Sequence, residues 1–271
     1  MPTVYISPTG GAVTQDGTTP DTAYAYSSLG SAETDAGNGG TILFLDGTYT
    51  ITAAQTWDAG TFDDMTYKSL NDNGAYLFGS TAGGEHRVTL GSSTTSTLKF
   101  EGFKIANIHF LSLNTTCTFN KVNKVDTLSA NTFNGNGLFR LNGTLANQIT
   151  NSSFTIDYSG NDKLFYNLNS STINNCSFFI KCSSAASNGI TSSGDPGTIK
   201  NTIFMSDTSA SIADSVINIG NCTNCCVHQM HSNDSSGGTN NVFADPQFVD
   251  SASGDLRLRP TSPCIGAGTA S

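Results

Sequence analysis

The 271-residue sequence predicts an all-β fold wound as a solenoid, and three observations support this prediction. Charged residues make up only 12% of the chain, about half of the roughly 25% usual in soluble domains, so long solvated helices are not expected. The 16 Phe and 8 Tyr, with a net charge of only −9, are too aromatic and too weakly charged for a disordered chain. The third observation is a short phrase that recurs with a period in the low twenties.

The repeated phrase is an aliphatic residue, any residue, Asn, two further residues and then Phe. Of the 26 Asn residues, 23 lie between residues 101 and 250. The copies are Ile105–Phe110, Ile149–Phe154, Ile173–Phe178 and Ile199–Phe204, with weaker copies at Asn131 and Asn224. A leucine-rich repeat would need a Leu consensus, which is missing, whereas a coil of three short strands and three turns fits this length. The sequence therefore predicts a right-handed parallel β-helix, with stacked Phe inside and an amide ladder of Asn at one bend.

Both ends of the chain carry further motifs. They are Val4–Gly10, Asp16–Pro20 and Gly39–Tyr49 near the start, and Asn241–Asp250, Gly254–Leu258 and Ser262–Gly268 near the end. Together with the Asn-rich coils, they resemble the right-handed parallel β-helix superfamily, which includes pectate-lyase-like proteins and many phage tailspikes. The resemblance covers nearly the whole chain and departs from the closing pattern at Cys264, where a small residue such as Ala is more usual. It implies the fold, whereas lyases, hydrolases, adhesins and virion parts all share that fold.

The elements follow from this fold. We expect one domain over residues 1–271, with an N-terminal cap at 1–40, coils at 41–242 and a C-terminal cap at 243–271. A short amphipathic helix within residues 23–36 would cover the open end of the solenoid. Strands are expected at Ile42–Leu45, Tyr76–Phe78 and Val88–Leu90.

Strand alternation predicts which side chains point outward. If the repeat Phe is inside, the residue after it points out, as does the residue two positions further on. The first outer column is Leu111, Thr155, Phe179, Met205 and His228, and the second is Leu113, Asp157, Lys181, Asp207 and Met230. We expect a subunit interface or a platform for a sugar ring here, formed by Thr155, Asp157, Phe179, Lys181, Met205 and Asp207. The alternative is an ordinary charge-compensated strand face.

The sequence favours no catalytic residue, cofactor or metal. Asp157 and Asp207 would lie two coils apart, roughly 9–10 Å, with Lys181 between them, which suits an inverting glycosidase pair only at the upper limit. Cys222, Cys225, Cys226, His228 and His231 are dense enough for a metal site, but alternation places them on both faces of a strand. The seven Cys are expected to be reduced thiols.

Partners and location follow from charge and hydropathy. The acidic balance and few Arg argue against nucleic acid, and no apolar run is long enough for a membrane span. Residues 1–5 do not resemble a secretion signal, which indicates synthesis in a cytoplasm. The leading hypothesis is a non-enzymatic phage virion component (a head decoration, tailspike or receptor-binding subunit), as a homotrimer or bound to other virion proteins and possibly to a polysaccharide. The alternatives are a polysaccharide lyase or related carbohydrate-active enzyme, and an extracellular adhesin.

Overall fold

The computed structural model contains two compact units, residues 1–123 and 124–271, called here the N-terminal and C-terminal units. The described residues are 2–11, 14–57, 61–80, 86–91, 97–112, 115–125, 139–141, 146–158, 165–166, 171–182, 197–207, 222–229 and 238–269. None of the described helices is long and apolar enough to cross a membrane.

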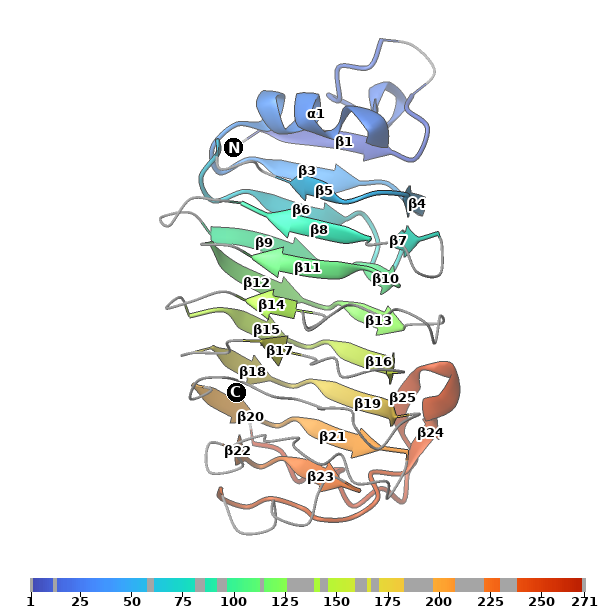
Figure 1. The fold of residues 1–271 in the computed structure, drawn as a ribbon, viewed down its shortest axis with the longest axis vertical. Coiled ribbons are helices and arrows are strands. Elements are labelled where there is room, and N and C mark those ends of the chain that lie inside the picture. Colours follow the sequence, from blue (N-terminus) through green and yellow to red (C-terminus); the bar gives the residue numbers. More distant parts are fainter. Residues whose placement is uncertain are drawn as a thin grey trace. The chain divides into compact units, whose positions relative to one another are not determined.

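The N-terminal unit consists of parallel strands that pair with the strand one coil later, in three sheets (Figure 1). The first sheet contains β2 (Tyr24–Ala25), β1 (Thr3–Ser7), β3 (Thr41–Phe44), β6 (Thr66–Ser69), β9 (Thr97–Glu101) and β12 (Thr116–Asn120). The second contains β4 (Gly47–Ile51), β7 (Ala75–Gly79) and β10 (Lys104–Ala106). The third contains β5 (Gln55–Trp57), β8 (Arg87–Leu90) and β11 (His109–Ser112). The three predicted strands are confirmed as β3, β7 and β8.

Aromatic side chains fill the interior of the N-terminal unit. Phe100 stacks on Tyr67 with ring centroids 5.1 Å apart, and on Phe119 at 5.3 Å. All three side chains are fully buried. Strand pairing brings equivalent residues of successive coils about 4.8 Å apart, so rings at equivalent positions stack on one another.

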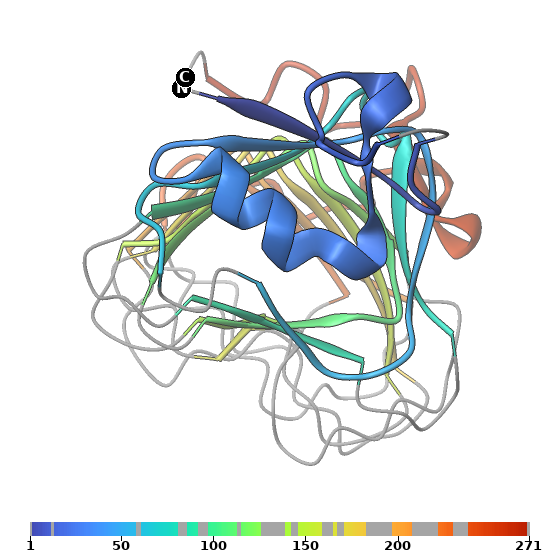
Figure 2. The ribbon, with the colours of Figure 1, turned by 90° about the horizontal axis from the view of Figure 1, so that it is seen from above.

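A helix lies at the start of this unit, as predicted. Helix α1 (Leu29–Ala36) follows the 3₁₀ turns η1 (Pro20–Thr22) and η2 (Tyr26–Ser28). It lies across the end of the first coil (Figure 2) and buries Leu29, Ala32, Glu33 and Ala36. Strand β1 already pairs with β3 in register, Thr3 opposite Thr41, so strand pairing begins within the segment that we expected to be a cap.

The C-terminal unit repeats the coil, with strands of two or three residues in one sheet and up to six residues in the next. One sheet contains β15 (Gln148–Thr150), β18 (Thr172–Asn174), β20 (Thr198–Lys200) and β22 (Cys222–Thr223). The next contains β16 (Ser153–Tyr158), β19 (Ser177–Cys182), β21 (Ile203–Ser206) and β23 (Cys226–His228), and β14 (Phe139–Leu141) pairs with β17 (Phe165–Tyr166). β13 (Asn123–Val125) spans the sequence boundary between the units. An antiparallel hairpin, β24 (Phe248–Asp250) and β25 (Asp255–Leu258), joined by the 3₁₀ turn η4 (Ser251–Ser253), follows the coils.

The predicted Phe stack and Asn bend are confirmed in the C-terminal unit. Phe178 stacks between Phe154 and Phe204, with centroids 4.8 and 5.0 Å away and interplanar angles of 6° and 8°. The four Asn at the bend have positive φ: Asn151, Asn175, Asn201 and Asn224, at 50°, 54°, 49° and 54°. Asn tolerates this left-handed conformation better than most residues, which explains its recurrence.

One copy of the repeat was placed in the wrong register. Asn107 lies in the turn between β10 and β11, and Phe110 in β11 pairs with Val88 of the third sheet. The turns between the first and second sheets of the N-terminal unit instead contain Asn73, Gly102 and Lys121, with φ of 63°, 78° and 55°, and Asn73 is not part of a copy of the phrase. A left-handed Asn thus occurs in two different turns of the coil, so the phrase alone cannot identify which turn it forms. Asn131 lies outside the described residues.

Candidate functional site

The structure places the six predicted site residues in two adjacent columns on one strand face of the C-terminal unit. Thr155, Phe179 and Met205 are cross-strand partners, and so are Asp157 and Lys181. The Asp207 amide donates to the Ile180 carbonyl at 3.1 Å, which places Asp207 beside Lys181. For these six residues, the predicted columns are therefore correct in backbone register. The side chains of Asp157 and Lys181 lie outside the described residues.

The prediction that Phe179 is exposed is wrong. Only 3% of Phe179 and 1% of Thr155 are exposed. The hairpin β24–β25 covers the column: Phe179 forms an apolar cluster with Phe248 and Leu256, and Ile203, Met205 and Leu258 pack against it. Figure 1 shows the hairpin beside β19 and β21. The outward apolar stripe is thus covered by the chain's own C-terminal segment, whereas Asp207 stays exposed. Leu111 is also misplaced, because it pairs with Thr89 in the N-terminal unit.

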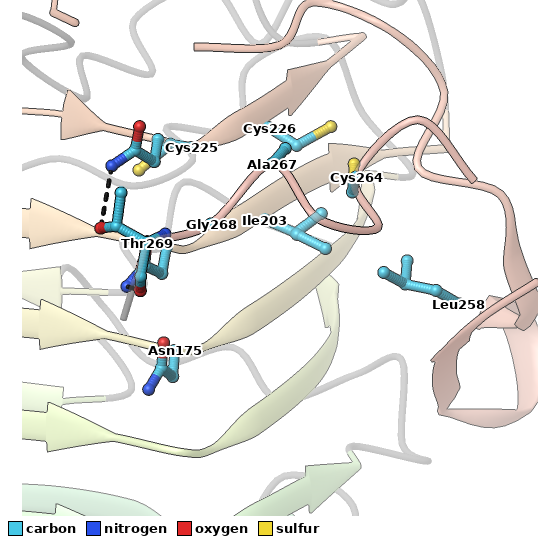
Figure 3. A pocket seen from close by; sticks show the side chains of 11 residues that line it. Asn175, Ile203, Cys225, Cys226, Leu258, Cys264, Ala267, Gly268 and Thr269 are labelled. Carbon is cyan, nitrogen blue, oxygen red and sulfur yellow. Dashed lines mark hydrogen bonds between the residues drawn. The ribbon is translucent and has the colours of Figure 1, made fainter. Parts of the chain in front are cut away.

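The C-terminal segment also closes the Asn bend of the same unit. The Thr269 amide donates to Asn201 Oδ1 at 3.0 Å, and Asn201 Nδ2 donates to the Thr269 carbonyl at 3.1 Å. Asn224 Nδ2 contacts Thr269 Oγ1 at 3.2 Å, and Asn175 Nδ2 donates to Asn151 Oδ1 at 3.3 Å. A cavity of about 230 Å³ remains between this segment and the bend (Figure 3). These amides serve mainly to hold the coil and the tail together.

The dense cysteines form structural contacts. Cys225 Sγ donates to the Thr223 carbonyl at 3.5 Å, and Cys226 Sγ donates to the Ala244 carbonyl at 3.3 Å. Cys226 and Cys264 both line the small cavity, and Figure 3 shows their sulfur atoms turned toward each other. The neighbouring Cys226 thiol lowers the pKa of Cys264. His231, the last member of the proposed metal motif, lies outside the described residues.

The N-terminal unit presents an aromatic surface that the sequence did not reveal as a site. On the second sheet, Tyr76 lies between Thr48 and Lys104 in register, and Phe78 lies between Thr50 and Ala106. The two rings are partly exposed, with centroids 5.6 Å apart, and the two Thr are exposed. Thr48, Thr50, Tyr76, Phe78 and Lys104 are called the aromatic face below. The alternation of Tyr76-Leu77-Phe78 was the available signal, because it turns both rings to the same side of the strand.

Lys104 gives the aromatic face its charge. Its Nζ lies 4.8 Å from the centroid of the Tyr76 ring, a cation–π contact. It forms no ion pair with any carboxylate of the described residues, whereas Lys121 nearby pairs with Asp72 at 3.1 Å. Asp46 in the adjoining turn accepts a hydrogen bond from Asn71 at 2.8 Å. The face therefore combines two apolar rings with an ammonium group whose charge is not neutralised by a described residue.

The comparisons with known proteins identify the fold. No family profile matches the chain, and no curated protein matches it in sequence. Among solved structures, the pectin methylesterase PemA from Erwinia chrysanthemi superposes with a TM-score of 0.53 and 10% identity, over 89% of each chain. The chain is a right-handed parallel β-helix. Pectate lyase Pel9A is also similar to this β-helix, with a TM-score of 0.48 and 14% identity over 99% of this chain and 92% of the lyase. At these identities the likeness concerns the fold.

Proposed function

We propose that this β-helix binds an acidic polysaccharide on its aromatic face. The observation that carries the proposal is the pair of partly exposed rings, Tyr76 and Phe78, beside the Lys104 ammonium. Aromatic rings offer a flat apolar surface on which the C–H face of a sugar ring can stack. An ammonium with no carboxylate partner among the described residues can pair with a uronate carboxylate.

The likeness to PemA supports a carbohydrate ligand over a virion role. This pectin methylesterase shares the fold, and its name gives pectin as its substrate. The virion role, the homotrimer and binding to other virion proteins stay predictions from the sequence. One reason for predicting a homotrimer was the outward apolar column at Phe179. The hairpin β24–β25 covers that column.

The proposal concerns binding and not cleavage. A lyase needs a base and usually a carboxylate cluster for a cation, and a hydrolase needs two carboxylates across the scissile bond. The carboxylates described near the aromatic face already have partners, since Asp72 pairs with Lys121 and Asp46 binds Asn71. Among the described residues, a polysaccharide held on this face would therefore meet an aromatic and cationic surface without two available acids.

Binding of oligogalacturonate to the full chain, measured by titration calorimetry, tests the proposal. Tyr76→Ala should weaken binding about tenfold, which corresponds to ~1.4 kcal/mol, a typical contribution of one aromatic contact. Lys104→Ala should weaken it by a similar factor and make it less sensitive to salt. The matched controls are Phe243→Ala, an aromatic residue that is 50% exposed elsewhere, and Lys200→Ala, an exposed lysine. Equal losses in the controls, or no binding by the unaltered chain, would refute the proposal. Release of unsaturated sugars in the same samples would instead establish a lyase.

A further inference from the structure

A second cavity lies in the N-terminal unit, between the segment before β3 and the first coil. Its volume is about 540 Å³, within the 300–1,000 Å³ typical of small-ligand sites. The polar side chains that line it include Tyr26, Glu33, Thr50, Thr52, Gln55 and Thr56. Helix α1 forms one wall through Gly30 and Glu33, and strands β4 and β5 with the residues between them form the other.

The chain itself satisfies only some of the polar groups of this cavity, and three of them belong to the exposed residues Thr50, Thr52 and Thr56. Gln55 Oε1 accepts hydrogen bonds from the Tyr26 hydroxyl at 2.5 Å and from Trp57 Nε1 at 3.2 Å, which fixes the orientation of its amide. Gln55 Nε2, by contrast, donates to no described residue. The hydroxyls of Thr50, Thr52 and Thr56 likewise form no hydrogen bond with the described part of the chain. An oriented amide donor and three hydroxyls around one cavity are suited to a ligand rich in hydroxyl groups.

Charge determines which hydroxylated ligand fits. The Glu33 carboxyl group is buried, accepts a hydrogen bond from the Tyr67 hydroxyl at 2.7 Å and lines the cavity. Burial raises the pKa of Tyr26, so this phenol remains a neutral hydrogen-bond donor. None of the described residues that line the cavity is a lysine or an arginine. A carboxylate on the ligand would be taken out of water in a cavity whose described lining has no lysine or arginine to pair with it, which is unfavourable.

We infer that this cavity is a binding site for a neutral monosaccharide-sized sugar, held by Gln55, the three Thr hydroxyls and Glu33. The site goes beyond the proposed function, because it uses a largely different set of residues. It also selects a neutral sugar, whereas the aromatic face selects an acidic one. Only Thr50 belongs both to this cavity and to the aromatic face. A site that hydrogen-bonds ligand hydroxyls discriminates strongly against ligands that leave its groups unpaired.

The test uses two ligands that differ only at one carbon, D-galactose and D-galacturonate, with D-glucose and L-rhamnose as further neutral probes. Saturation-transfer NMR on the full chain should show transfer to at least one neutral sugar and a several-fold weaker signal for galacturonate. Gly30→Leu should abolish transfer, because a Cβ at Gly30 meets no atom within 4 Å and the longer side chain would extend into the cavity. Ser31→Leu adds the same side chain at an exposed position of α1 and should have no effect.

A conservative variant separates binding from folding. Thr52→Val keeps the size and shape of the side chain but removes a hydroxyl that forms no hydrogen bond with the described part of the chain, so binding should fall several-fold while the thermal midpoint changes little. Tyr76→Ala should leave galactose binding unchanged, so failure of this site and failure of the aromatic face are distinguishable. No transfer to any neutral sugar, equal transfer in Gly30→Leu, or preferred binding of galacturonate would overturn the inference.

Discussion

Replacing Phe179 with Ala tests whether the C-terminal hairpin covers the outer apolar column. Phe179 is 3% exposed and packs against Phe248 and Leu256. Removing a buried Phe side chain typically costs about 3–5 kcal/mol. We expect the lower end, about 3 kcal/mol, because a hairpin near the chain terminus can relax toward the space left by the ring. For a unit of this size, that corresponds to a fall of roughly 6–12 °C in the melting temperature.

Urea denaturation gives the free energy of unfolding, and limited trypsin digestion reports local opening of the hairpin. Arg257 lies in β25 with 80% of its side chain exposed, so a loosened hairpin should be cut there faster in Phe179→Ala. Phe243→Ala is the matched control, since that ring is 50% exposed and its loss should cost less than about 0.5 kcal/mol. A stability change below that value for Phe179→Ala, with an unchanged digestion rate, would show that the column is open and the packing argument wrong.

Three further predictions concern single side chains. Cys264 is partly exposed and its pKa is lowered, whereas burial raises the pKa of Cys176 to about 12. A thiol reagent should therefore label Cys264 quickly. Cys264→Ser should remove this fast phase of labelling, and the control Cys176→Ser should not. Asn175 has a φ of 54°, so Asn175→Ala should destabilise the chain by about 1–2 kcal/mol in urea and Asn175→Gly by much less. Arg257 lowers the pKa of Asp255 to about 2, so the stability that this carboxylate contributes is present above pH 4 and disappears as the pH falls from about 4 to 2. In Arg257→Ala, NMR titration should find the Asp255 pKa near 3.8; a value still near 2 would contradict this explanation.

The coils around the Asn-Phe phrase could be predicted because stacking ties sequence to structure there. Each coil places its Phe on the Phe of the coil before, at 4.8 to 5.0 Å, so the same residue type is favoured at every period. The left-handed turn likewise favours Asn at 151, 175, 201 and 224. Helix α1 could be predicted because its apolar residues recur at helical spacing, and four of its residues are buried.

What the sequence could not predict depends on contacts between distant segments. Phe179 points outward as expected, but alternation does not tell whether an outward ring meets solvent, a partner or residues 248–258 of the same chain. The phrase at Asn107 could not be assigned to its turn, because a left-handed Asn occurs in more than one turn of the coil. Tyr76–Phe78 was predicted to be a strand. However, the first hundred residues lack the repeated phrase that would have shown which side chains of this strand point outward.

The most direct test of the aromatic face is a crystal structure of the full chain with bound oligogalacturonate. We predict a sugar ring stacked on Tyr76 or Phe78, with a uronate carboxylate within hydrogen-bonding distance of Lys104 Nζ. If an oligosaccharide that binds in solution lies elsewhere on the β-helix and leaves Tyr76, Phe78 and Lys104 uncovered, the proposed function is wrong.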